Sequence, residues 1–61
     1  MHVRLRRGEG NALFNMSLAL DKLGDRKGAI ELSEAALTIY EQIEDPTAGM
    51  VRSRLEEWKK K

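Results

Sequence analysis

The residue pair Gly24-Asp25 is a stop-and-restart signal between two strongly helical stretches, and it constrains the fold more than any other feature. Glycine readily adopts the left-handed conformation in which many helices end, so Gly24 predicts the end of a helix that begins at about Glu9 or Asn11. Aspartate accepts hydrogen bonds from the first amides of a helix, so Asp25 predicts the start of a second helix that ends near Ile43. The corner therefore predicts an antiparallel helical hairpin.

A second signal of the same kind follows at Asp45-Pro46. Asp45 is a capping residue, and proline is favoured at the first position of a helix, so the pair predicts a third helix that lasts to about Trp58. No run of four or more residues alternates cleanly between apolar and polar before a turn pair, so strands are not indicated. The sequence predicts an all-α fold, a helical hairpin with a third helix.

The spacing of apolar residues predicts what the later helices touch. On the second helix, small and apolar side chains cover about half the circumference, which indicates neighbours on more than one side; they are Ala29, Ile30, Leu32, Ser33, Ala36, Leu37, Ile39, Tyr40 and Ile43. The third helix has only a narrow stripe, which indicates packing on one side, as in a terminal lid; it consists of Ala48, Val51, Leu55 and Trp58.

The first helix has two apolar faces. The expected core stripe is flanked by alanines and consists of Leu13, Met16, Ser17, Leu20 and Leu23. Phe14 and Leu18 lie four residues apart on a different face, beside polar residues. A folded monomer gains nothing from leaving such a pair in water, so this second face is the first indication of function.

Composition limits the remaining possibilities. With 61 residues the chain is one small domain, near the size at which a single core is marginally stable. It has no cysteine, which excludes disulfides and thiol chemistry and favours a reducing compartment, so we expect the cytoplasm. It has no apolar run of 18 residues, so no membrane span is expected. The net charge of +1 favours no particular partner, although the second helix is acidic and the third is basic.

The run ALFNMSLALDKLGDRKGAIELSEAALTIYEQIEDP resembles a tetratricopeptide repeat, a pair of antiparallel helices. Ser17 stands at the small position where the helices of that family cross, and Gly24-Asp25 matches the family's G-D turn. Ala29-Ile30 and Ala36-Leu37 match its A-I and A-L pairs, and Pro46 its closing proline. The second helix is longer than in the common motif, as in the repeats of kinesin light chains and of bacterial signalling proteins with regulatory repeat arrays.

The resemblance implies three segments. Residues 1–10 are a basic lead-in, residues 11–45 are the repeat, and residues 46–61 resemble the capping helix that closes such arrays. Repeat units bury their faces against neighbours, so the chain is expected to be a fragment of an α-solenoid or a unit that must associate.

The resemblance also implies a function, protein–protein interaction without catalysis or cofactor, as a scaffold or regulatory repeat. The first helices of such arrays line a groove that holds a peptide or a partner helix. The positions that would face this groove are Asn11, Phe14, Asn15, Leu18, Asp21 and Lys22. Phe14 and Leu18 would supply an apolar anchor, and the Asn15 amide could donate to and accept from a peptide backbone. Alternatively, Phe14 and Leu18 pack on a preceding repeat or on the N-terminal segment, and Asn15 is merely solvated.

Two other functions remain open. The isolated chain could self-associate, either face to face or by exchange of the third helix across the Asp45-Pro46 bend, which would make it a homo-oligomer. Nucleic-acid binding is a distant third, since the acidic second helix would be repelled by phosphate. A catalytic or metal site is not indicated. His2 is the only histidine and lies at the terminus, and Gly8-Glu9-Gly10 lacks the context of a phosphate loop.

Overall fold

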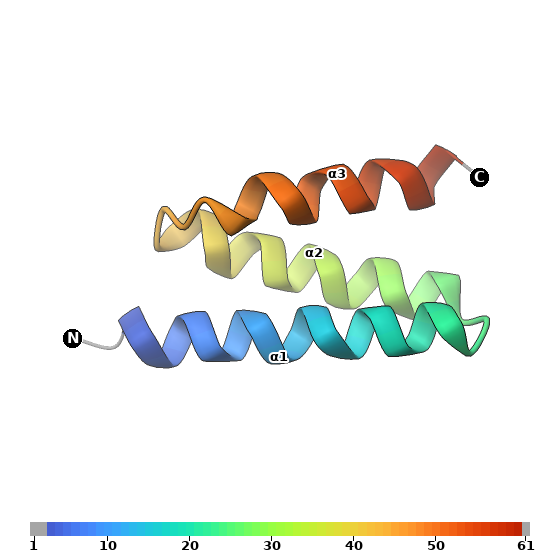
Figure 1. The fold of residues 1–61 in the computed structure, drawn as a ribbon, viewed down its shortest axis with the longest axis horizontal. Coiled ribbons are helices and arrows are strands. Elements are labelled where there is room, and N and C mark those ends of the chain that lie inside the picture. The colour runs from blue at the N-terminus through green and yellow to red at the C-terminus, as the bar shows by residue number, and fades with distance from the viewer. Residues whose placement is uncertain (1–2, 61) are drawn as a thin grey trace.

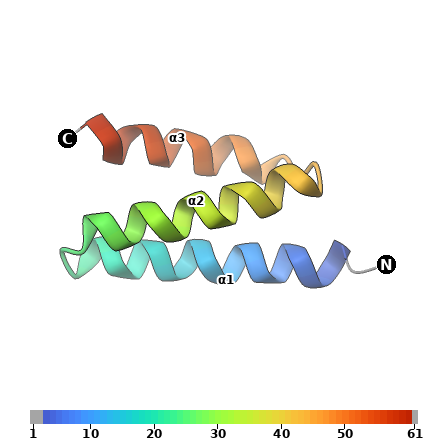
Figure 2. The same cartoon turned by 180° about the vertical axis from the view of Figure 1, so that it is seen from behind.

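Within residues 3–60 the fold consists of three helices: α1 (Val3–Lys22), α2 (Arg26–Gln42) and α3 (Thr47–Lys60). The computed structural model describes the backbone of residues 3–60 and the side chains of residues 6–60. Those residues contain no strand, so the predicted all-α hairpin with a third helix is confirmed. Figure 1 shows that α2 lies between α1 and α3 and that each helix runs antiparallel to the one before it, and the view from behind in Figure 2 agrees.

The α1 helix begins earlier than expected. The sequence predicts a start at Glu9 or Asn11, whereas α1 already begins at Val3. Two arginines explain the extension: Arg6 donates a hydrogen bond to the Gln42 side chain, and Arg7 forms an ion pair with Asp45 at 3.0 Å. Both contacts hold the first turns of α1 against the far end of the hairpin.

Two predictions concern the chain ends. The segment Gly8-Glu9-Gly10, which the sequence places in the basic lead-in before the first helix, is part of α1. His2 lies outside the residues that the structure describes, as do Met1 and Lys61.

The turn between α1 and α2 has the predicted chemistry. Gly24 has a φ of +89°, in the left-handed region, and the Asp25 amide donates to the Leu20 carbonyl oxygen at 2.8 Å, which closes the end of α1. The Asp25 carboxylate accepts a hydrogen bond from the Gly28 amide at 2.9 Å and so caps α2.

The turn between α2 and α3 repeats this arrangement without a glycine. Glu44 occupies the left-handed region with a φ of +56°, and the Asp45 amide donates to the Tyr40 carbonyl oxygen at 2.9 Å. The Asp45 carboxylate then accepts from the Thr47 amide at 2.8 Å, which confirms Asp45 as the residue that starts α3. Both of the first two helices therefore end in a residue with a positive φ that is followed by a capping aspartate.

Small residues let α1 and α2 approach closely. Ser17 and Ser33 are fully buried, and the Ser33 hydroxyl donates to the Ser17 hydroxyl oxygen at 2.8 Å. The Ser17 hydroxyl in turn donates to the Phe14 carbonyl oxygen at 2.5 Å, so neither buried oxygen lacks a partner. Gly10 lies against the Tyr40 ring. The expectation that Ser17 marks a close helix crossing is confirmed.

One core cluster joins the three helices. Its buried members are Phe14, Ala29, Ala36, Tyr40, Val51, Leu55 and Trp58. The predicted stripe of α3 is confirmed, since three of its residues are buried and Ala48 packs against the cluster. The predicted face of α2 is confirmed as well. Two ion pairs then join the acidic α2 to the basic α3: Lys59 with Glu34 at 2.8 Å, and Arg52 with Glu41.

Candidate functional site

The six residues predicted to face a binding groove lie in different environments. Phe14 is only 8% exposed and belongs to the core cluster, and Leu18 is half-buried against that cluster. The expectation that this pair lies on a face outside the core is therefore wrong. Asn11 accepts a hydrogen bond from the Tyr40 hydroxyl, and Asp21 accepts one from Arg26 at 2.6 Å, so both side chains already have partners within the chain.

The remaining two residues, Asn15 and Lys22, are exposed. They are the members of the predicted set that stay available to a partner.

The orientation of α1 explains the difference. A core stripe through Met16 and Leu23 was expected, yet their side chains are 55% and 81% exposed. Among residues 6–22 of α1 the buried ones are instead Gly10, Phe14 and Ser17, at intervals of four and three residues. The helix is thus rotated relative to the predicted face, because Gly10 and Ser17 are small enough for α2 to cross there.

This rotation leaves an apolar surface on α1, which we call the outer face and define as Ala12, Met16, Ala19 and Leu23. All four residues are exposed and recur at intervals of four, three and four positions, so they lie on one side of the helix. Leu23 follows the last helical residue, but its amide still donates to the Ala19 carbonyl oxygen at 3.1 Å and thus continues the helical path.

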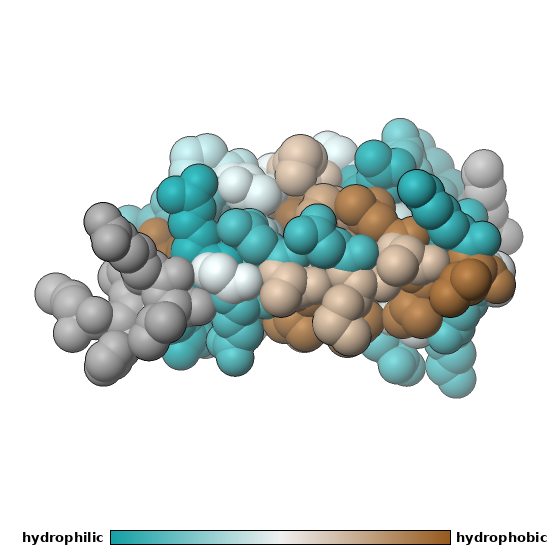
Figure 3. Space-filling model, turned by 60° about the horizontal axis from the view of Figure 1, so that its bottom comes forward, coloured by the Kyte–Doolittle hydropathy of each residue, from teal (hydrophilic) through white to brown (hydrophobic). Residues whose placement is uncertain are grey.

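The surroundings of the outer face are uncharged over most of its length. Two half-buried leucines, Leu13 and Leu20, extend the apolar surface toward the core. Between Glu9 and Asp21 the sequence has no charged residue. Figure 3 shows apolar atoms gathered over the middle of the molecule and toward the end where α1 turns into α2. Asn15 and Lys22 precede Met16 and Leu23 by one position, and so border the outer face on one side.

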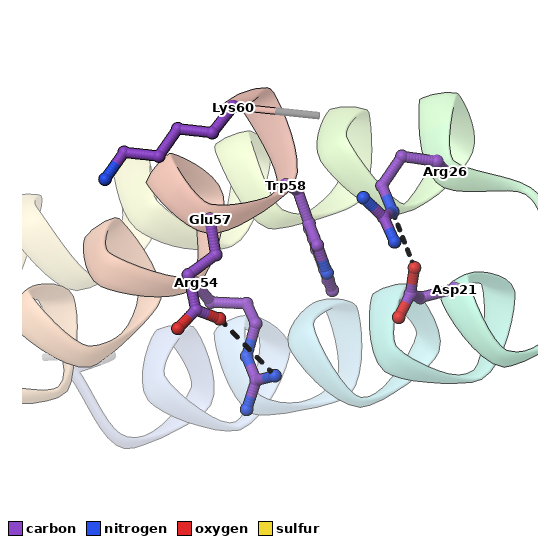
Figure 4. A pocket seen from close by; sticks show the side chains of 6 residues that line it. All are labelled: Asp21, Arg26, Arg54, Glu57, Trp58 and Lys60. Carbon is purple, nitrogen blue, oxygen red and sulfur yellow. Dashed lines mark hydrogen bonds and ion pairs between the residues drawn. The ribbon is translucent and has the colours of Figure 1, made fainter.

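A second feature is an open depression of about 480 Å³ where the last turns of α1 and α3 meet the start of α2 (Figure 4). The Trp58 ring forms its apolar part and is 5% exposed. Figure 4 shows this ring between two charged pairs: Arg26 with Asp21, and Arg54 with Glu57 at 4.0 Å. The Arg26 guanidinium carbon also lies 5.8 Å from the centre of the Trp58 ring, a cation–π arrangement.

These pairings show what the depression does within the fold. Four of the five charged residues that line it form two ion pairs within the depression itself, and the fifth is Lys60. The arrangement is that of a packed junction, in which Arg26 holds the α1–α2 corner and covers the Trp58 ring. Asp21, one of the predicted site residues, therefore acts in the fold by pairing with Arg26.

Two ionisable groups at the opposite end of the hairpin have shifted pKa values. Hydrogen bonds from Thr47, and to a smaller extent the Arg7 guanidinium, hold the pKa of the Asp45 carboxyl below its usual range. Burial, followed by the nearby Asp45 charge, raises the pKa of the Tyr40 hydroxyl, and Arg7 partly opposes this shift. Both groups tie α1 to the α2–α3 turn.

Neither a metal site nor a membrane span is found in the described part of the chain. No group of three or more metal-ligating side chains occurs among these residues. No helix within residues 3–60 combines the length and the apolar character that crossing a bilayer requires. Comparison of the sequence and the structure with protein-family models, curated proteins and solved structures gives no match.

The outer face was missed because an amphipathic helix with two apolar sectors does not show which one faces the core. The spacing of small residues does not decide between the two sides, because Gly10 and Ser17 lie seven positions apart on the side that α2 crosses, and Ala12 and Ala19 lie seven apart on the other side. The sequence signal that points to the correct side is the glycine, since Gly10 has no side chain and allows the closest helix approach.

Proposed function

We propose that this chain is a protein–protein interaction module, a non-catalytic helical unit of the tetratricopeptide-repeat type that binds a partner helix on the outer face of α1. The observation that carries the proposal is the exposure of Met16 and Leu23, at 55% and 81%, within one apolar surface. Complete burial of such a side chain contributes about 1.5–3 kcal/mol, so a partner that covers both gains a substantial part of a binding energy.

The form of this surface favours a helix as the partner. Intervals of four and three residues are those of a helical seam, in which side chains of one helix insert between those of another. Ala12 and Ala19 leave room for close approach, and Met16 and Leu23 project beside them. Asn15 and Lys22 would contribute polar contacts at the edge, which keeps a part of the predicted binding set in the proposal.

The resemblance to tetratricopeptide repeats supports the same class of function, since repeats of that family act through packed helices and bound peptides. The lack of cysteine fits a reducing compartment, and we propose the cytoplasm as the site of action. Nucleic acid is a weaker candidate for the partner. Arg7, Arg52 and Lys59 each pair with a carboxylate of this chain, and the exposed side of α2 is acidic.

Site-specific photo-crosslinking in the cells that produce the protein tests the proposal. A photoreactive phenylalanine analogue replaces Ala19 on the outer face, and a matched control replaces Ser53, which is exposed on α3. We expect a discrete polypeptide adduct from position 19 and none from position 53. Equal adducts at the two positions, or none at position 19, would contradict a binding role for the outer face.

A further inference from the structure

We propose that the partner of the outer face is a second copy of this chain, packed with its α1 antiparallel to the first. The inference rests on the proposed function, because it names the occupant of the same surface. The argument comes from the order of side-chain sizes along the outer face and from the charges at its two ends.

The outer face alternates small and large residues in the order Ala12, Met16, Ala19 and Leu23. If two copies lie antiparallel with Met16 opposite Ala19, then Leu23 comes opposite Ala12 in the same register. Every large side chain then meets a small one, and two-fold symmetry repeats each pair. A parallel, in-register pair would instead place Met16 on Met16 and alanine on alanine, which leaves gaps between the alanines.

The charges favour the same direction. Glu9 precedes Ala12 by three positions and Met16 by seven, so it lies at the N-terminal end of the same side of α1. In a parallel pair, Glu9 of one copy would face Glu9 of the other, and like charges at such a position repel. In the antiparallel register, Glu9 faces the α1–α2 corner of the second copy. The exposed Lys22 and Lys27 lie there together with Asp25, whose carboxylate accepts a hydrogen bond from the Gly28 amide.

Face-to-face pairing also needs less rearrangement than exchange of the third helix, which must first leave its own chain. Val51, Leu55 and Trp58 are buried in the core cluster of their own chain. The two ion pairs between α2 and α3 further hold α3 in place. The outer face of α1, by contrast, is available without any change in the fold.

Sedimentation equilibrium of the 61-residue chain from micromolar to millimolar concentration is the first test. We expect a monomer–dimer equilibrium. Met16→Glu introduces a charge at the centre of the outer face and should weaken the dimer at least tenfold, while Ser53→Glu, a matched change on α3, should leave the dissociation constant within twofold. Circular dichroism of both variants checks that helicity is kept, as expected for two exposed positions.

A monomer at all concentrations would overturn the second copy as the partner, and so would equal dimerisation of the wild type and Met16→Glu. Neither result would touch the proposed function. That function is judged separately by the crosslink from position 19, whose mass distinguishes an adduct between two copies from an adduct with another polypeptide.

The orientation has its own test, because the natural chain has no cysteine. Met16→Cys and Ala19→Cys chains are mixed in equal amounts and oxidised, and the disulfide-linked products are separated by mass. An antiparallel pair with Met16 opposite Ala19 should give the mixed disulfide, which joins one chain of each variant, in clear excess over the statistical half. An excess of disulfides between two chains of the same variant would overturn the antiparallel arrangement.

Discussion

Phe14 and Met16 stand two residues apart in α1 and face opposite environments: the Phe14 side chain is 8% exposed in the core, and that of Met16 is 55% exposed on the outer face. Residues two positions apart in an α-helix differ in direction by about 200°, so in α1, which packs against α2 on one side, burial of Phe14 goes with exposure of Met16. This relationship fixes the rotation of α1 about its axis. The rotation places Phe14 in the core, where the sequence predicted a groove residue, and it exposes the outer face that we propose as the interaction surface.

Alanine substitutions at these two positions test the rotation directly. Phe14→Ala removes a buried ring and should lower the free energy of unfolding by about 3–5 kcal/mol, close to the entire stability of a domain this small. Met16→Ala should change it by less than about 0.5 kcal/mol, because the side chain is largely in water. Urea denaturation followed by circular dichroism, at a concentration where the chain is monomeric, measures both. A reversed order of the two values would place Met16 in the core.

The helices and their turns were largely predictable, because the deciding chemistry is local. Asp25 caps the helix that it precedes, and Gly24 adopts a left-handed conformation that glycine accepts without strain in any sequence context. The rotation of α1 was not predictable in this way. It depends on Gly10 and Ser17 meeting residues of α2, which lie far along the sequence, and only the packed hairpin shows that contact.

The true start of α1 was missed for a similar reason. Gly8 and Gly10 have low helix propensity, which favours a start after them. The contact of Arg7 with Asp45 stabilises the early turns against that preference, and no local pattern announces it. For the candidate site, the sequence predicted that apolar residues of the first helix would form it. It did not predict which side of that helix is exposed.

Alanine substitutions at Gly10 and at Gly8 test, as variant and control, whether α1 and α2 approach closely at position 10. A Cβ on Gly10 would lie 3.2 Å from Cζ of Tyr40, whose ring is 1% exposed and whose hydroxyl is held by Asn11, so the ring has no room to yield. Gly10→Ala should therefore destabilise the fold by about 1 kcal/mol despite the better helix propensity of alanine.

No atom lies within 4 Å of a Cβ built on Gly8, so Gly8→Ala should stabilise the fold by about 0.5–1 kcal/mol. Thermal unfolding of the two variants beside the wild type gives the comparison. Equal stabilisation by both changes would mean that α1 and α2 do not approach closely at position 10.

Gly24 and Glu44 occupy equivalent positions at the ends of α1 and α2, both with a positive φ. Glutamate is strained in the left-handed region and glycine is not, so Glu44→Gly should stabilise the chain by about 0.5–1 kcal/mol. Gly24→Ala should destabilise it by a similar or larger amount, since φ there is +89°. Denaturant midpoints of the two single variants and the double variant measure these effects, which should add because the two turns lie at opposite ends of the hairpin.

Asp45 makes folding sensitive to acid. Its pKa is held below the usual range by hydrogen bonds from Thr47 and by Arg7, whereas the unfolded chain has the ordinary value. A depressed folded-state pKa contributes stability above the unfolded pKa, and this contribution is lost as pH falls through the folded-state value. The midpoint of thermal unfolding should therefore fall in acid less steeply for Asp45→Asn than for the wild type. Glu56→Gln, on the exposed side of α3, serves as the control and should follow the wild-type curve.

Tyr40 makes folding sensitive to alkali, with the opposite sign. Burial raises the pKa of its hydroxyl above 10, and the negative Asp45 adds to this shift. A raised folded-state pKa contributes stability that is complete below the unfolded pKa of about 10 and is lost as pH rises through the folded-state value. Tyr40 is the only tyrosine, so its ultraviolet absorbance reports its ionisation without interference.

We expect the tyrosine absorbance of the native chain to change above pH 10, in the same pH range in which helicity is lost. In guanidinium chloride the absorbance should change near pH 10, as for an unfolded tyrosine. Tyr40→Phe keeps most of the packed ring but has no proton to lose and should resist alkali longer than the wild type. Native titration at the same pH as in denaturant would show that the Tyr40 hydroxyl lies in water, and it would contradict the placement of this ring against Gly10 in the core.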